Sequence, residues 1–270
     1  MTTDDRTLAI QQLWTDGDYH RLAEHFAPAA HQLVDDLALT GRTVLDAGTG
    51  TGNAALAAVR AGAEVAAFDL TPALLAHAQK RAEEAQVGIE FREGDLLDIP
   101  WPDDSFDVVL SVFAAFLADD PARCLAELVR VCRPGGRIVT TAWSERSIFL
   151  RMMRLAHAHD PDIVRLADPG PFADRERLTE LACELPVRRI EVADYPLPLA
   201  FASADAAMTL FEDTSGPVQN LAAAFADRWP PLRADIVADW QRIQTPDGPG
   251  VLLPAVYRVA TLHLAPATTV

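Results

Sequence analysis

The chain has 270 residues, a length that suits one large domain or a domain with an appended cap. Half of the residues are hydrophobic and 23% are charged, which excludes a disordered or fibrous chain. The net charge of −16 argues against DNA and bulk RNA as partners, because an acidic surface repels a phosphate backbone.

Cysteine spacing and the N-terminal sequence give the expected compartment. Cys124, Cys132 and Cys183 do not have the spacing of a zinc or redox motif, so we predict reduced thiols and no metal. The N-terminus lacks the basic start and apolar core of a signal peptide, and no stretch approaches the ~18 apolar residues of a membrane span. The sequence therefore predicts a cytoplasmic protein without a membrane partner, and it leaves the oligomeric state open.

Residues 1–40 are predicted to form an N-terminal helical lid. Apolar residues from Leu8 to Trp14 repeat at approximately helical spacing, and a second helical stretch runs from about Tyr19 to Phe26. Pro28 then begins a third helix, since proline is favoured at the first helical position.

Residues 41–145 are predicted to form the core, because short β-branched and apolar runs alternate there with helical stretches. Helices are expected at 54–59, from Thr71-Pro72 onward, and at 121–132. Strands are expected at 43–46, 63–69, 89–91, 106–111 and 137–143. This alternation predicts a mainly parallel sheet with helices on both faces.

Residues 146–270 are predicted to form a substrate cap together with the last strands of the sheet. Residues 145–185 and 203–245 have mostly helical patterns, whereas 187–192 and 256–264 are expected to be strands. The predicted fold class is thus α/β, with a doubly wound, mainly parallel sheet of seven strands.

The segment VLDAGTGTGN at residues 44–53 is the strongest indication of a ligand site. Glycines at Gly48 and Gly50 allow a sharp turn from strand to helix and a close approach by a ligand. A tight turn without a ligand, or a dinucleotide loop, also fits this segment alone. Asp69 lies 21 residues after Gly48 at a predicted strand end, where a carboxylate can bind both ribose hydroxyls. The pair favours a nucleoside cofactor.

Three further segments separate the possible cofactors. REGDLL at 92–97, PDDSFDVVLS at 102–111 and RVCRPGG at 130–136 are not expected in a nicotinamide dehydrogenase. With VLDAGTGTGN and FDLTP, they resemble the class I S-adenosylmethionine-dependent methyltransferases. The resemblance covers about residues 40–145 closely and 10–40 more weakly. It implies a Rossmann-like methyltransferase fold, S-adenosylmethionine as cofactor, S-adenosylhomocysteine as product and a small-molecule acceptor.

The resemblance also assigns residues to parts of the cofactor. Gly48, Thr49 and Gly50 would surround the methionine moiety, and Asp69 would bind the ribose. Leu70 would pack against the adenine.

The remaining assignments lie in the adenine loop, at the ends of two strands and in the N-terminal helices. Asp95 would accept the adenine amino group, and the Leu96 amide would reach a ring nitrogen. Ser111 would lie beside the methionine amino group and face the substrate. Asp46 either contacts that ammonium through water or braces the glycine loop. Tyr19, with Trp14, either closes over the cofactor or is plain core.

Methyl transfer from a sulfonium is an in-line displacement that depends mainly on positioning and the exclusion of water. We therefore assign no catalytic base, although five histidines are candidates: His20, His25, His31, His157 and His159. The expected acceptor is partly apolar, such as a secondary metabolite or a quinone- or phenol-like compound, methylated on O, N or C. A non-methylating cyclase or isomerase is the main alternative, and a non-catalytic sensor is another.

Overall fold

The computed structural model of the protein describes residues 3–15, 18–163 and 170–267. The chain divides into two compact units, which we call the sheet unit and the helix-rich unit. The sheet unit comprises Phe26–Ala142, Gly170–Ala193 and Arg258–Val270. The helix-rich unit comprises Met1–His25, Trp143–Pro169 and Asp194–Tyr257. Whether residues 1–40 act as a lid and 146–270 as a cap stays a prediction.

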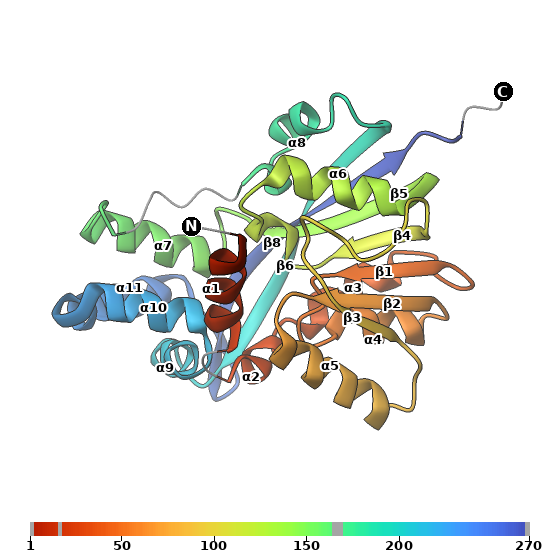
Figure 1. Ribbon diagram of the computed structural model, residues 1–270. Coiled ribbons are helices and arrows are strands. Elements are labelled where there is room, and N and C mark those ends of the chain that lie inside the picture. Colours follow the sequence, from red (N-terminus) through yellow and green to blue (C-terminus); the bar gives the residue numbers. More distant parts are fainter. Residues whose placement is uncertain (1–2, 16–17, 164–169, 268–270) are drawn as a thin grey trace. The chain divides into compact units, whose positions relative to one another are not determined.

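The sheet has the strand order β3-β2-β1-β4-β5-β8-β6, with a short β7 paired to β8 (Figure 1). Strands β1 to β5 are mutually parallel, whereas β7 is antiparallel to β8. The bounds are β1 Thr43–Ala47, β2 Glu64–Asp69, β3 Glu90–Glu93, β4 Phe106–Ser111, β5 Cys132–Trp143, β6 Val187–Phe201, β7 Thr245–Asp247 and β8 Gly250–Leu264. The predicted α/β fold with seven main strands is confirmed, and β7 is an additional strand that the sequence analysis missed.

Five α-helices belong to the sheet unit, and each begins where the sequence supplies a suitable start. They are α3 Ala27–Asp35, α4 Asn53–Arg60, α5 Pro72–Glu84, α6 Pro121–Val131 and α8 Arg175–Leu181. Asp120 caps α6 by accepting a hydrogen bond from the Arg123 N–H. The buried face of α6, including Leu125 and Leu128, joins the core under the sheet. Each such buried leucine contributes about 1.5–3 kcal/mol to folding.

The described residues of the helix-rich unit form six α-helices: α1 Thr3–Thr15, α2 Tyr19–Glu24, α7 Ile148–His159, α9 Ala204–Thr214, α10 Gly216–Phe225 and α11 Trp229–Ile243. Its core includes the fully buried Phe211 and Trp240, whose rings meet edge to face with centroids 5.5 Å apart. Ser203 caps α9 with its side chain. Among the helices in the described ranges, none has both the length and the apolar character that a membrane crossing needs.

A bidentate ion pair joins α7 to α11, and we expect its removal to destabilise the helix-rich unit. The Nε and Nη2 atoms of Arg151 each lie 2.8 Å from an Asp239 carboxylate oxygen. Burial opposes ionisation of Asp239, but bonds from Arg151 and Arg242 hold its pKa below the ordinary range. Replacing Asp239 with alanine should lower the free energy of unfolding by about 2 kcal/mol, measured by urea denaturation.

Asp235→Ala is the matched control for that measurement. Asp235 lies one turn earlier on α11 and pairs with His159 at 2.8 Å, but its side chain is 60% exposed. An exposed pair contributes little, so this variant should change stability by less than about 0.5 kcal/mol. Equal losses in the two variants would contradict a special role for the Arg151–Asp239 pair.

Candidate functional site

The glycine loop, residues 47–53, connects β1 to α4 and is held against the end of β2. The N–H groups of Gly48 and Thr49 donate to the carbonyl of Phe68 at 3.0 and 2.8 Å. Gly48 has φ +75°, and a Cβ there would lie 2.5 Å from the Ala114 Cβ, so only glycine fits. Gly50 has φ +53°, and nothing lies within 4 Å of the position its Cβ would take. The loop is therefore closed at Gly48 and open at Gly50.

Asp69, the last residue of β2, faces the open part of this loop. One carboxylate oxygen accepts the Gly50 N–H at 2.7 Å, and the other accepts the Thr71 N–H at 2.8 Å. Burial raises the pKa of Asp69, and these two backbone bonds oppose the shift. The Thr71 hydroxyl and the Leu70 N–H also bond to this carboxylate and oppose the shift. Its contact with a ribose stays a prediction.

Asp46, in β1 just before the glycine loop, also holds this loop, and Asp46 is only 1% exposed. A single oxygen, Oδ2, accepts the Thr49 hydroxyl at 2.7 Å and the Ala55 N–H at 2.9 Å. Burial, with a smaller contribution from the charge of Asp69, raises its pKa from 3.8 to about 6. Of the two roles predicted for Asp46, these bonds show the brace; a contact with a ligand's ammonium stays a prediction. The Thr49 hydroxyl bonds within the loop, and the predicted contact of Thr49 with the methionine moiety stays a prediction.

The adenine loop expected after β3 forms a tight turn near Gly48. Asp95 is half-buried and accepts the Leu97 N–H at 2.9 Å through Oδ1. The Cδ1 atom of the half-buried Leu96 lies 3.9 Å from the position of a Cβ on Gly48. The structure thus brings Asp95 and Leu96 to the glycine loop, while Leu70 lies half-buried directly after Asp69. Their contacts with adenine stay predictions.

Ser111 ends β4 as expected, and it is fully buried. Its hydroxyl donates to the carbonyl of Ala47 at 2.9 Å and accepts the Ala115 N–H at 3.0 Å. The side chain therefore ties the end of β4 to the end of β1. Its place beside the methionine amino group stays a prediction.

Two residues near the loop were missed by the sequence analysis. Phe113 has φ +57°, a strained value for a residue with a Cβ, and its N–H donates to the Thr141 hydroxyl at 2.8 Å. Arg81 on α5 bonds to Thr51 and Asn53 in the loop. Arg81 could have been found as a cation on the inner face of the predicted helix; no sequence signal marked Phe113.

The predicted aromatic and histidine candidates lie mostly in the helix-rich unit. Tyr19 packs edge to face on Trp14 with centroids 5.1 Å apart, so its contact with the cofactor stays a prediction. His25 stacks on Phe201 at 4.8 Å, and burial lowers its pKa. His159 is paired with Asp235, and no cluster of metal-ligating side chains occurs in the part of the chain that the structure describes. No catalytic base is assigned.

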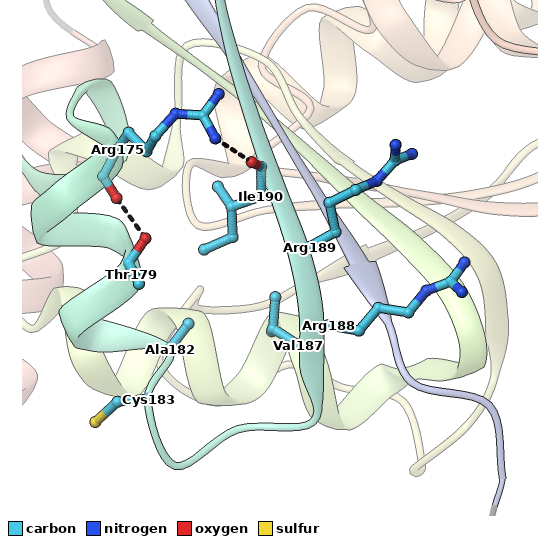
Figure 2. A pocket seen from close by; sticks show the side chains of 8 residues that line it. All are labelled: Arg175, Thr179, Ala182, Cys183, Val187, Arg188, Arg189 and Ile190. Atoms are coloured by element: carbon cyan, nitrogen blue, oxygen red, sulfur yellow. Dashed lines mark hydrogen bonds between the residues drawn. The ribbon is translucent and has the colours of Figure 1, made fainter.

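A pocket with a volume of about 280 Å³ lies elsewhere in the sheet unit, between α8 and β6. Figure 2 shows Arg188 and Arg189 on the opposite side of β6 from Val187 and Ile190. Because β6 ends the strand order and β1 lies near its middle, this pocket is separate from the glycine loop.

The fold and the glycine loop together indicate a class of protein. An open, largely parallel α/β sheet with a glycine turn after β1 and an acid ending β2 is the arrangement of nucleoside-binding proteins. Residues 45–140 match the model of the methyltransferase domain family. This match covers about a third of the chain, in the part where the sequence motifs resemble the class I S-adenosylmethionine-dependent methyltransferases.

Two relatives are similar in sequence to parts of this chain. The uncharacterized protein Rv1405c of Mycobacterium tuberculosis is 36% identical over 177 residues, 64% of this chain and 65% of the relative. The match thus spans just under two thirds of that relative. The demethylmenaquinone methyltransferase of Thermus thermophilus is 42% identical over 108 residues, 38% of this chain and 49% of the relative.

Solved structures agree with the fold. The YcgJ protein from Bacillus subtilis is 18% identical, with a TM-score of 0.59, and the alignment covers 87% of this chain and 97% of that chain. The predicted Rossmann-like methyltransferase fold is therefore confirmed.

Proposed function

We propose that the protein transfers a methyl group from S-adenosylmethionine to a small-molecule acceptor. The observation that carries the proposal is the pairing of Asp69 with the Gly50 N–H, which sets a buried carboxylate beside the open part of the glycine loop. The matching family model favours methyl transfer as the reaction, and the hydrogen-bonding groups around the glycine loop suit S-adenosylmethionine.

The fit rests on three observations in the sheet unit. Open space at Gly50 leaves room for a ligand against the loop backbone. The Asp69 carboxylate, beside that open space, would bind the ribose, and the Asp95 carboxylate, in the turn after β3, would accept the adenine amino group. Two buried acids, Asp46 and Asp69, favour a ligand that carries positive charge. A neutral or anionic nucleotide would lack that attraction.

When bound, S-adenosylmethionine supplies an activated methyl group on a positively charged sulfur. This chain then has to orient the donor and exclude water, because well-oriented partners gain about 7–11 kcal/mol toward the transition state. Asp69 would fix the ribose, and the braced loop of Gly48 to Gly50 would fix the methionine end. No general base is required unless the acceptor is a poorly acidic hydroxyl or a protonated amine.

The acceptor proposed is a quinone- or phenol-like compound or a secondary metabolite, methylated on O, N or C. The name of the Thermus thermophilus relative supports a quinone-like substrate for that protein, and the likeness extends to 38% of this chain. The charge of −16 disfavours nucleic acid. Residues 1–40 would act as the lid and 146–270 as the substrate cap, in a cytoplasmic enzyme.

Calorimetric titration with S-adenosylhomocysteine and with NAD tests the cofactor, and incubation with methyl-labelled S-adenosylmethionine and a panel of phenols, hydroquinones and amines tests the reaction. We expect S-adenosylhomocysteine to bind, NAD not to bind, and label to enter at least one acceptor. Binding of NAD alone would refute the proposal. An acceptor rearranged without label would favour the cyclase or isomerase, and saturation without turnover would favour a sensor.

Replacing Gly50 with alanine should weaken cofactor binding with little effect on folding. The new Cβ enters open space, so the backbone strain of a positive φ is its main folding cost, about 1 kcal/mol. The same methyl group would intrude on the ligand and should raise the Kd of S-adenosylhomocysteine by about tenfold to a hundredfold, measured by calorimetry.

Gly41→Ala is a close control, because Gly41 has φ +70°, also has nothing within 4 Å, and precedes β1 at its opposite end. It should cost the same stability and leave the Kd unchanged. If both variants bind equally well, the ligand does not contact Gly50.

A further inference from the structure

The side chain of Arg81, on α5, bonds to the glycine loop. Its Nη1 donates to the Thr51 carbonyl at 2.5 Å and to the Asn53 Oδ1 at 2.9 Å, with a longer contact of 3.4 Å to the Thr51 hydroxyl. The helix also approaches the loop closely one turn earlier, since a Cβ on Gly52 would lie 3.1 Å from the Ala78 Cβ. Both contacts fall just after the open position at Gly50.

The Thr51 carbonyl belongs to a peptide group that is held at both ends. The N–H of that same planar group, on Gly52, donates to the Thr49 carbonyl at 2.9 Å and closes the turn around Gly50. Arg81 holds the carbonyl side of the group. The orientation of this peptide sets the turn that contains Gly50, so a bond to the carbonyl restrains the turn as a whole.

Successive parts of the loop are each held by a different charged side chain. Asp46 accepts from Thr49 and Ala55, Asp69 accepts from Gly50, and Arg81 donates to Thr51 and Asn53. The two acids come from strand ends and are expected of the fold. Arg81 comes from the last turn of α5 and supplies the only charged donor of the three. Without it, the carbonyl of Thr51 and the amide of Asn53 lose a charge-assisted bond.

We propose that Arg81 is a positioning residue that holds the glycine loop in its ligand-binding conformation before the cofactor arrives. The inference rests on the proposed function, since S-adenosylmethionine is the ligand whose affinity Arg81 would raise. Because a preformed loop does not have to be ordered when the cofactor binds, less free energy is lost and the affinity is higher. Arg81 itself needs no contact with the cofactor.

The experiment compares the wild type with Arg81→Met, Arg81→Lys and the control Lys80→Met in two measurements. Lys80 is the preceding residue on α5, its side chain is 71% exposed, and its Nζ lies 3.8 Å from the Glu84 carboxylate. The first measurement is hydrogen exchange of the cofactor-free protein over residues 46–56. The second is calorimetric titration with S-adenosylhomocysteine, under conditions where melting curves show every variant to be folded.

We expect Arg81→Met to speed exchange in the loop by about tenfold or more, leave the other strands protected, and raise the Kd by roughly fivefold to thirtyfold. Arg81→Lys should lie between Met and the wild type, because one ammonium can restore part of the bonding. Lys80→Met should match the wild type in both measurements. A general loss of stability would instead raise exchange in all strands together.

Loop exchange and a Kd within twofold of the wild type in Arg81→Met would overturn the proposal. If Arg81→Met does not fold, Arg81→Lys decides: unchanged exchange and affinity in that variant overturn the proposal as well. If the wild type itself does not bind S-adenosylhomocysteine, the proposed function fails. The exchange measurement still decides whether Arg81 holds the loop, because it uses no ligand.

Discussion

Replacing Asp69 with alanine is expected to raise the Kd of S-adenosylhomocysteine by about a hundredfold to ten-thousandfold. The carboxylate would accept one charge-assisted hydrogen bond from each of two ribose hydroxyls, and each bond would be worth about 1.5–3 kcal/mol. It also accepts the Gly50 N–H at 2.7 Å, so its loss frees the turn that carries the open ligand position. Calorimetry on the folded variant measures the change.

Two further variants separate charge from shape. Glu64→Ala removes an exposed acid from the opposite end of the same strand and should bind like the wild type. Asp69→Asn keeps one acceptor oxygen and should lie between the wild type and Asp69→Ala. If Asp69→Ala binds within fivefold of the wild type, the acid does not hold the ribose and the proposed function loses its central observation.

The sequence was sufficient to predict the part of the sheet that consists of short strands separated by few residues in the chain. β1, β2 and β4 are short apolar runs, and helices connect β1 to β2 and β2 to β3, so these consecutive strands pair as neighbours in the sheet. Parallel strands in this order bring their carboxyl ends to one edge. That is why Asp46, the glycine loop, Asp69 and the turn at Asp95 were predicted together and lie together.

The strands β6, β7 and β8 were predicted less well, because prolines and charged residues interrupt the apolar pattern by which a strand is recognised in the sequence. The predicted strand at 187–192 extends through Pro196 and Pro198 as far as Phe201. Prolines are tolerated there because β6 is an edge strand, at the end of the strand order. Pro254 similarly falls inside β8, which begins at Gly250 instead of Val256. The hairpin strand β7 has only three residues, all exposed, and carries no hydrophobic alternation.

The directions in which the side chains at the site point could also not be predicted from the sequence. A motif places Ser111 at the end of β4, but the Ala47 carbonyl on the neighbouring strand decides where its hydroxyl points. Thr49 similarly turns to Asp46. Arg81 reaches the loop from 30 residues away in sequence. Such contacts depend on how helix and strands pack, which no local pattern specifies.

Replacing Asp46 with asparagine is expected to stabilise the protein and weaken its proposed function at the same time. Burial raises the pKa of Asp46 from 3.8 to about 6, so ionising this carboxyl at pH 7 costs up to about 3 kcal/mol of folding free energy. Both donors, the Thr49 hydroxyl and the Ala55 N–H, bond to one oxygen, and the asparagine oxygen can accept both. The variant should therefore be more stable at pH 7 by about 1–3 kcal/mol in urea denaturation.

The pH dependence tests the cause of that gain. Between pH 3.8 and about 6 the folded protein binds more protons at Asp46 than the unfolded chain, so this group's contribution to stability rises as the pH falls through that range. Asp46→Asn should lack this part of the profile. Asp107 is the control of opposite sign: bonds from Thr43 and Arg133 outweigh its burial and lower its pKa, so Asp107→Asn should destabilise the protein at pH 7.

The same substitution should distinguish the methyl donor from its product. S-adenosylmethionine carries a sulfonium charge that S-adenosylhomocysteine lacks, so losing a buried negative charge should weaken binding of the donor more than of the product. The wild type should also lose donor affinity as the pH falls through about 6, and the variant should not. A buried acid that destabilises the fold yet strengthens binding of a cation would explain why the loop rests on a carboxylate instead of an amide. A variant that is less stable than the wild type at pH 7, or that binds donor and product with an unchanged ratio, would contradict this explanation.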